Sequence, residues 1–221
     1  MWASPWRPAW MCWRDMGLFL PEQPVQTVVY LPGSREQAER VFAMLTRPVA
    51  LVSLPVDWNR DLSPWPAQRV FKAGEDFTGG AEGFLAHLLE EVIPNVEGRL
   101  PSPVDKRCIA GYSLAGLFAL WAVTRTDVFH GSASMSGSIW YDGFLDYAAG
   151  QPFCTERLYL SVGDREKKTR NTRMACVEDC TRALADQAVG QGLQCAFRLE
   201  SGGHFDDCEV RIARGIDWLT T

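Results

Sequence analysis

Ser113 is the side chain of this sequence best placed to act as a nucleophile. It lies in the segment 111–116 (GYSLAG), between a short segment over 106–110 that we expect to form a buried strand and a strongly apolar helical pattern over 114–123. So tight a reversal strains the backbone at the serine, and small residues two positions before and after it relieve the crowding. The pattern Gly-x-Ser-x-Ala predicts a nucleophile elbow. The competing interpretation is an ordinary helix-capping serine.

A serine hydroxyl is a weak nucleophile near neutral pH, so it needs a base, which is usually a histidine held by a carboxylate. His204 follows a predicted strand and lies in the glycine-rich segment 201–207. That places it on a loop at the carboxyl end of a strand, from which it can reach a nucleophile on a neighbouring strand. His87 falls on an amphipathic helical pattern and His130 before a predicted strand, where surface or structural roles are expected. We therefore expect His204 to be the base, against the alternative of an exposed turn histidine.

The acidic member of such a triad is expected between the serine and the histidine along the chain, the order that the α/β-hydrolase fold imposes. A predicted strand over 157–162 is followed by two carboxylates, Asp164 and Glu166. Asp164 is nearer the strand end, whereas Glu166 has the longer reach, so the sequence geometry leaves both open. We expect the unused carboxylate to be a solvated loop charge or a partner of Lys167, Lys168 or Arg170.

Attack of a serine on an ester carbonyl creates an oxyanion, which needs N–H donors. The first expected donor is the N–H of Leu114, at the start of the helix that follows the elbow. Gly33 and Ser34 follow an early predicted strand, and one of their amides is the expected second donor. The alternative for these two residues is a plain turn before a helix.

A polar and aromatic loop over 57–66 follows another predicted strand, and we expect it to overhang the same edge of the sheet. Arg60 is a candidate ligand of a substrate carboxylate or phosphate, or else braces its own loop through a neighbouring aspartate. Trp65 and Trp140 are candidate apolar walls of the substrate site, or else ordinary packing residues. Tyr112, beside the serine, is a further candidate for contact with substrate.

The overall pattern alternates strands with helices. After a strand or hairpin within Met11–Leu20, the expected strands cover residues 25–31, 50–54, 106–110, 131–135, 157–162 and 194–199. The expected helices cover residues 35–45, 82–94, 114–123, 173–189 and 208–219. This order predicts a mostly parallel sheet covered by helices on both faces, which is an α/β-hydrolase fold with three layers and no large cap domain.

Length and composition narrow the class of protein. With 221 residues and 47% hydrophobic composition, the chain suits one domain over 1–221, with residues 1–20 as an N-terminal extension. A net charge of −5 and the lack of a lysine–arginine stripe argue against a nucleic-acid partner. No apolar run is long enough to span a bilayer, and residues 1–10 lack the basic start and apolar core of a secretory signal. We expect a cytoplasmic protein with no membrane partner.

The seven cysteines are scattered rather than spaced as a disulfide framework, which fits a reducing compartment. Cys176 and Cys180 stand four apart on a predicted helix and would share a face. Neither a Cys-x-x-Cys motif nor a nearby histidine supports metal binding there. We expect buried or boundary thiols, no metal and no cofactor.

These features resemble the esterase branch of the α/β-hydrolases, which includes esterase D, the enterobactin and related siderophore esterases, feruloyl esterases and mycolyltransferases. The resemblance runs from about Val25 to Trp218. It rests on four segments, which are NRDLSP at 59–64, GYSLAG at 111–116, LYLSVGDRE at 158–166 and GGH at 202–204. Relatives often carry His-Gly after the early strand, where this chain has Pro32 and Gly33.

The resemblance implies a serine esterase with a small-molecule ester substrate. Siderophore esterases of this branch often have a Gly-x-x-Glu turn at the third segment, which favours Glu166 over Asp164 as the acid. The expected activity is hydrolysis of a carboxylic ester through an acyl-enzyme. An acyltransferase or a thioesterase would use the same triad, and a non-catalytic hydrolase-like binding module is the alternative of another class.

Overall fold

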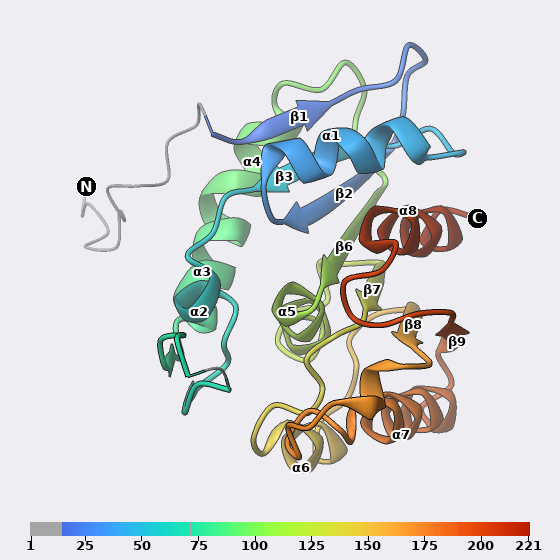
Figure 1. Ribbon diagram of the computed structural model, residues 1–221. Helices are drawn as coiled ribbons and strands as arrows, with labels where there is room; N and C mark the ends of the chain where they lie inside the picture. The colour runs from blue at the N-terminus through green and yellow to red at the C-terminus, as the bar shows by residue number, and fades with distance from the viewer. Residues whose placement is uncertain (1–14, 71) are drawn as a thin grey trace.

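The computed structural model describes residues 15–70 and 72–221. Within them, one main sheet has seven strands. In spatial order they are β1 (Gly17–Phe19), β3 (Ala50–Leu54), β2 (Thr27–Pro32), β6 (Lys106–Tyr112), β7 (Gly131–Met135), β8 (Arg157–Gly163) and β9 (Gln194–Glu200). β1 runs antiparallel to β3, and the other neighbouring pairs are parallel (Figure 1). The sheet is therefore the mostly parallel one that the alternation predicts.

Helices cover both faces of this sheet. One face carries α1 (Arg35–Met44) and α8 (Cys208–Leu219), and the other carries α3 (Ala81–His87), α5 (Leu114–Ala122) and α7 (Val177–Gly190). In Figure 1, α5 and α8 lie on opposite sides of β6. The result is a three-layer α/β sandwich, as expected for an α/β-hydrolase fold.

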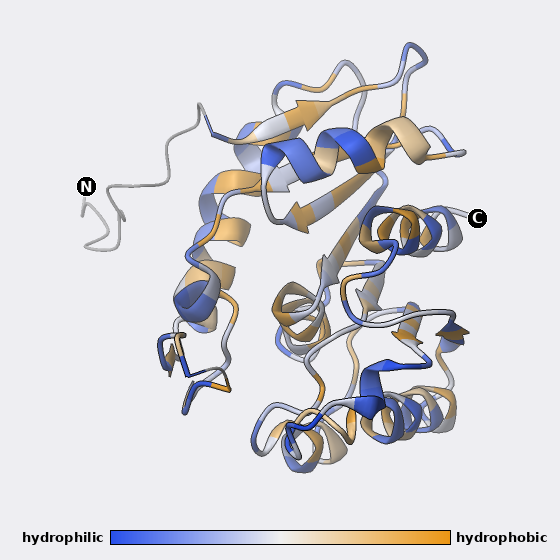
Figure 2. Ribbon diagram, in the orientation of Figure 1, coloured by the Kyte–Doolittle hydropathy of each residue, from blue (hydrophilic) through white to orange (hydrophobic). Residues whose placement is uncertain are grey.

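Each layer is built from local sequence preferences that agree with burial. β2 reads TVVYLP, a run rich in β-branched and aromatic residues, and nearly all of it is buried. α5 reads LAGLFALWA and is buried along its whole length, because it packs between the sheet and its neighbouring helices. α1 is capped by Ser34, whose hydroxyl accepts a hydrogen bond from the Gln37 N–H at 3.1 Å. Figure 2 shows how the buried strand β2 differs from the partly exposed helix α1: β2 is coloured as hydrophobic, whereas α1 has mixed colours.

The helix predicted over 82–94 runs further than expected. α3 is followed by one π-helical segment, Leu88–Val92, and by α4 (Ile93–Glu97), so the helix continues through Pro94. The N–H of Ile93 bonds to the carbonyl of Leu88, five residues back. This wider turn accommodates the proline ring, which would clash with the carbonyl four residues back in a regular helix.

Three other segments differ from the sequence-based expectation. The helix expected from Arg173 begins only at Val177, because residues 171–176 form hydrogen-bonded turns around Asn171. The long loop after β3 contains the short helix α2 (Trp58–Asp61) and a small hairpin of β4 (Pro66–Ala67) and β5 (Phe77–Thr78). The helix α6 (Phe144–Ala149) was not expected, because six residues give too short a periodic pattern.

Part of the strand or hairpin expected within Met11–Leu20 lies outside the described residues. Its described part contains β1. In the described part of the chain, none of the helices has both the length and the apolarity to cross a membrane.

Candidate active site

Ser113 lies at the turn between β6 and α5, with φ 58° and ψ −121°. This left-handed backbone conformation is rare for a residue with a side chain, and here neighbouring segments hold it in place. The Ser113 N–H donates to the Met135 carbonyl at 3.1 Å, and the Ser113 carbonyl accepts from the Ser138 N–H at 2.9 Å. The serine is therefore presented on a strained, rigid turn, which is the geometry of a nucleophile elbow.

Gly111→Ala is expected to disrupt this turn. A Cβ at residue 111 would lie 2.2 Å from the backbone carbon and oxygen of Ala115, which cannot give way without moving α5. Overpacking of this kind costs about 1–3 kcal/mol of unfolding free energy, and a shifted α5 would also displace Ser113. Urea denaturation measures the stability loss, and ester hydrolysis measures the loss of activity.

Gly83→Ala is the matched control for this prediction. Gly83 lies in α3, and a Cβ there would meet no atom within 4 Å. Alanine is the better helix former by about 1 kcal/mol, so this variant should be at least as stable as the parent protein. Equal losses at positions 111 and 83 would contradict the steric explanation.

The imidazole of His204 joins Ser113 to a carboxylate. His204 lies in the loop between β9 and α8, and its Nε2 is 3.0 Å from Ser113 Oγ. Its Nδ1 is 2.8 Å from Glu166 Oε2. A proton on Nδ1 donated to Glu166 leaves the Nε2 lone pair facing the serine hydroxyl, which is the tautomer that a general base needs. Residues 113, 166 and 204 thus meet at the carboxyl ends of three strands of the sheet.

Glu166 begins a short 3-10 turn, Glu166–Lys168, just after β8, and its side chain is buried. Oε2 faces His204, whereas Oε1 accepts hydrogen bonds from the Ser136 hydroxyl and the Gly163 N–H, each at 2.7 Å. Burial raises the pKa of Glu166, but the hydrogen bonds from His204 and Ser136 outweigh it and bring the pKa below its ordinary value. The carboxylate is therefore ionised at neutral pH and can stabilise an imidazolium.

Asp164, the competing acid, contacts the backbone instead of the imidazole. Its Oδ1 accepts a hydrogen bond from the Gly202 N–H at 2.9 Å, and its own N–H donates to the Glu200 carbonyl at 2.8 Å. The carboxylate ties the loop after β8 to the loop that carries His204. Asp164 is exposed, as expected of a solvated loop charge, and its short side chain also lies within reach of a backbone amide.

One of the two candidate amides for the second oxyanion donor is already engaged. The Gly33 N–H donates to the Leu54 carbonyl at 2.9 Å, which extends the pairing of β2 with β3 by one residue. This excludes Gly33 as the donor and leaves the Ser34 amide as the prediction. The N–H of Leu114 is the first of α5, so no carbonyl one turn earlier in that helix is available to accept from it.

The structure places Arg60 against carboxylates of its own loop. Its Nε is 2.8 Å from Asp61 Oδ1, and its Nη1 is 3.9 Å from Asp57 Oδ2. The contacts with Asp61, the largest influence, raise the pKa of the guanidinium. These contacts match the loop-bracing alternative for Arg60.

The two tryptophans lie in one aromatic cluster at the loop after β7. Trp65 donates from Nε1 to the Asp142 carbonyl at 2.8 Å and packs against Tyr141, Phe144 and Tyr147. Trp140 lies two residues beyond Ser138, whose N–H donates to the Ser113 carbonyl, and the Arg173 guanidinium stands 5.8 Å from its ring. Trp65 therefore packs into the protein, whereas Trp140 is close in the chain to a residue that contacts Ser113.

Tyr112 was expected to contact substrate, but its hydroxyl contacts the protein backbone instead. Its hydroxyl donates to the His204 carbonyl at 2.6 Å, and the ring is buried. Burial, the largest influence, raises the pKa of Tyr112 well above the ordinary value, so the hydroxyl stays protonated and remains a donor. The residue before Ser113 thus holds the backbone of the loop that carries His204.

Three residues near the triad were missed by the sequence analysis. Ser136 donates to Glu166 from a left-handed backbone conformation with φ 47°. Arg211 in α8 is 1% exposed and contacts the same carboxylate. Phe205 is 83% exposed and stands edge-on to His204, with 5.0 Å between ring centroids. A signal existed only for Arg211, which falls on the apolar face of α8 where a hydrophobic residue is expected.

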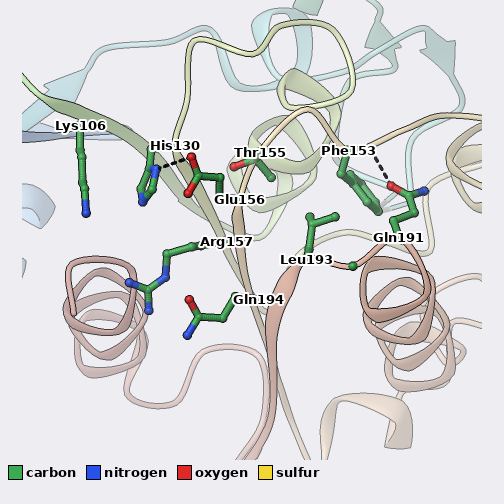
Figure 3. Close-up of a pocket in the computed structure, with 10 residues that line it drawn as sticks. Lys106, His130, Phe153, Thr155, Glu156, Arg157, Gln191, Leu193 and Gln194 are labelled. Atoms are coloured by element: carbon green, nitrogen blue, oxygen red, sulfur yellow. Dashed lines mark hydrogen bonds and ion pairs between the residues drawn. The ribbon is translucent and has the colours of Figure 1, made fainter.

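A separate pocket of about 670 Å³ opens at the other end of the strands, away from Ser113 and His204 (Figure 3). Its lining includes Lys106, His130, Arg157 and Gln194, which lie at or before the beginnings of strands. Figure 3 shows His130 turned toward Glu156, and His130 Nδ1 is 3.4 Å from Glu156 Oε1. Because the triad lies where the strands end, this pocket is not part of the candidate active site.

Cys176 and Cys180 share one face of the chain at the start of α7, with 3.3 Å between their sulfur atoms. Cys180 is buried and Cys176 is partly exposed, and both are free thiols. Burial, the largest influence, raises the pKa of Cys180 to about 12. These are the buried and boundary thiols that the sequence predicts.

Comparisons with known proteins agree with this geometry. A family model described as "Putative esterase" matches residues 18–204. The ferri-bacillibactin esterase BesA of Bacillus subtilis (strain 168) is 27% identical over 187 residues, which cover 77% of this chain and 58% of BesA. This chain therefore spans under two thirds of the length of that relative.

Two solved structures superpose closely on this chain. An IroE-like serine hydrolase from Shewanella oneidensis has a TM-score of 0.76 at 20% identity, over 92% of this chain and 74% of that one. Siderophore hydrolase EstA from Aspergillus nidulans has a TM-score of 0.72 at 21% identity, over 99% of this chain and 98% of that one. At these identities the likeness establishes the fold. Because the family model spans most of the chain, the protein belongs to this esterase family and is a carboxylic ester hydrolase with the α/β-hydrolase fold.

Proposed function

We propose that this esterase acts through a covalent acyl-enzyme formed on Ser113, with His204 as general base and Glu166 as the triad acid. One observation carries the proposal, which is the continuous set of contacts from Ser113 Oγ to His204 Nε2 at 3.0 Å and from His204 Nδ1 to Glu166 Oε2 at 2.8 Å. A base must lie within hydrogen-bond reach of the proton it removes, and these distances meet that requirement.

In the first half of the reaction, Ser113 Oγ attacks the ester carbonyl carbon while His204 Nε2 takes the hydroxyl proton. Glu166 stabilises the resulting imidazolium. The oxyanion of the tetrahedral intermediate accepts hydrogen bonds from the Leu114 N–H and from the Ser34 N–H. Collapse of the intermediate breaks the bond to the alkoxide, which takes the proton from His204 and leaves as the alcohol.

In the second half, His204 removes a proton from water, and the hydroxide attacks the acyl carbon on Ser113. The second tetrahedral intermediate collapses to the free acid, and Ser113 recovers its proton from His204. Each step uses groups of this chain and water alone, so the proposed reaction needs no metal or cofactor.

Two aromatic residues are proposed to contact the substrate. Phe205 stands next to His204 with most of its side chain in solvent, and a large exposed aromatic beside a reacting group suits contact with an apolar part of the ester. Trp140 would form a second wall. BesA and EstA are named for bacillibactin and siderophore hydrolysis, which makes a siderophore ester the first natural substrate to assay.

A fluorophosphonate probe tests the proposal without knowledge of the substrate. We expect one probe to attach per chain, in the tryptic peptide Cys108–Arg125, where Ser113 is the sole serine. The same preparation should hydrolyse a nitrophenyl acetate with a burst of nitrophenol. A folded protein that neither reacts with the probe nor hydrolyses the ester would be a binding module, and the proposal would be wrong.

A further inference from the structure

Among residues 15–70 and 72–221, Arg211 is the largest side chain that the fold buries almost completely. It lies in the first turn of α8, just after the loop that carries His204, and it is 1% exposed. Burial of a cation is costly unless charges and hydrogen bonds compensate for it. Here the compensating contacts are with Glu166, with residues that hydrogen-bond to Glu166 or His204, and with the loop that carries His204.

One edge of the guanidinium contacts the triad acid and its neighbours. Nη1 lies 3.2 Å from Glu166 Oε1, 3.0 Å from the Ser136 hydroxyl and 3.3 Å from the Tyr112 hydroxyl. Arg211, Ser136 and the Gly163 N–H all meet Oε1, so the other oxygen of Glu166 is left for the imidazole. The carboxylate thus has a single orientation, with one oxygen for support and one for His204.

The other edge of the guanidinium contacts the histidine loop. Nη2 donates to the Ser201 carbonyl at 2.9 Å, three residues before His204. Tyr112, which Nη1 also contacts, donates to the His204 carbonyl at 2.6 Å. A Cβ on Gly202, whose φ is 112°, would lie 3.1 Å from Nη2, so the loop fits closely around the guanidinium. Arg211 therefore connects the acid, the elbow and the loop of the base.

We propose that Arg211 is a positioning residue whose charge and hydrogen bonds hold Glu166 and the His204 loop in the reactive arrangement and limit how tightly the Glu166–His204 pair binds a proton. This inference rests on the proposed function. The physical reason is that a cation next to Glu166 Oε1 opposes protonation of the pair, which titrates as a unit. Loss of this cation is therefore expected to make protonation of the Glu166–His204 pair easier.

Among the described residues, few other ionisable groups surround Glu166, His204 and Arg211. Tyr112 from β6 and Cys208 from the start of α8 lie on one side of it. Asp206, within the loop that carries His204, forms an exposed ion pair with Arg165 at 2.8 Å. The buried charges in direct contact with Glu166 are therefore His204, when it is protonated, and Arg211.

The test compares Arg211→Gln, which removes the charge, with Arg211→Lys, which keeps it. We expect R211Q to lower kcat by about 10- to 100-fold, as misplaced reacting groups do, with KM for nitrophenyl acetate nearly unchanged. The acidic limb of its kcat/KM profile should move to higher pH. R211K should also lose kcat, because its geometry is poorer, but its acidic limb should stay at the position of the parent protein.

Arg214→Gln is the matched control on the same helix. Arg214 is partly exposed and pairs with Glu200 rather than with Glu166, so this variant should keep the activity and the pH profile of the parent protein. A folded R211Q with its acidic limb unmoved would overturn the proposal, since a purely structural residue changes the amount of active enzyme and not its pH profile. If R211Q does not fold, R211K decides, and a limb displaced to higher pH in that variant would overturn the charge role.

The outcome for Arg211 is separable from that for the triad. Failure of the parent protein to react with the fluorophosphonate would defeat the proposed function itself. Labelling at Ser113 in the parent protein, together with parental kinetics and pH profile in R211Q, would defeat this inference alone.

Discussion

Ser113→Ala is expected to lower kcat for a short acyl ester by about 10⁴- to 10⁶-fold while the protein stays folded, because the variant lacks the hydroxyl proposed to form the acyl-enzyme. The hydroxyl of Ser113 contributes hydrogen bonds to His204 and, at 3.5 Å, a weak one to Ser138. Its backbone bonds to Met135 and Ser138 do not depend on the side chain. Nitrophenyl acetate hydrolysis and fluorophosphonate labelling of the variant measure the effect.

Ser161→Ala is the matched serine control. The Ser161 hydroxyl is buried in β8 and makes no hydrogen bond within the described residues, whereas its backbone carbonyl accepts from the Ser136 N–H. Loss of the hydroxyl should therefore leave activity and labelling close to those of the parent protein. Substantial labelling that persists in S113A would show that the probe reacts elsewhere, and the elbow serine would not be the nucleophile.

Glu166→Gln is expected to lower kcat by about 10³- to 10⁴-fold, the usual loss when the triad acid becomes an amide. An amide nitrogen facing His204 Nδ1 would favour the wrong tautomer of the ring, and an uncharged side chain cannot stabilise an imidazolium. Steady-state kinetics with nitrophenyl acetate, compared between E166Q and the parent protein across the pH range, measure this effect.

Asp164→Asn is the comparison that decides between the two carboxylates. Its side-chain oxygen can still accept the hydrogen bond from the Gly202 N–H, so the histidine loop should remain tied to β8. We expect kcat within about threefold of the parent value, because Asp164 does not contact the imidazole. A loss in D164N as large as that in E166Q would contradict the assignment of Glu166.

The sequence predicts the regular elements well where local pattern and burial agree. Gly131–Met135 and Cys208–Leu219 have the predicted limits, because the first is a buried run of small residues and the second is an amphipathic run, each with clear ends. The prediction of where an element begins and ends is weaker where contacts with other segments determine these limits. Asn171 holds residues 171–176 in turns, and the π-helical segment before Pro94 lets a helix continue where proline normally ends it.

In the candidate site, too, some residues can be predicted from local sequence and others cannot. Ser113 and His204 can be found from sequence because each stands in a short segment with its own signature, a Gly-x-Ser-x-Ala turn and a glycine-rich loop after a strand. The choice between Asp164 and Glu166 cannot be made from the sequence, since both residues follow the same strand. It depends on which carboxylate reaches an imidazole 38 residues further along the chain.

The sequence by itself determined the order of strands and helices, the strained turn at Ser113 and the loop that carries His204, because these depend on residues a few positions apart. Tertiary structure alone decided that the Gly33 amide is occupied by Leu54, that Tyr112 holds the histidine loop, and that Arg211 meets Glu166. The physical reason is that a hydrogen bond or ion pair depends on atomic distances after the chain has packed. Residues 45 to 99 positions apart come within about 3.3 Å at this site, and no local pattern encodes that approach.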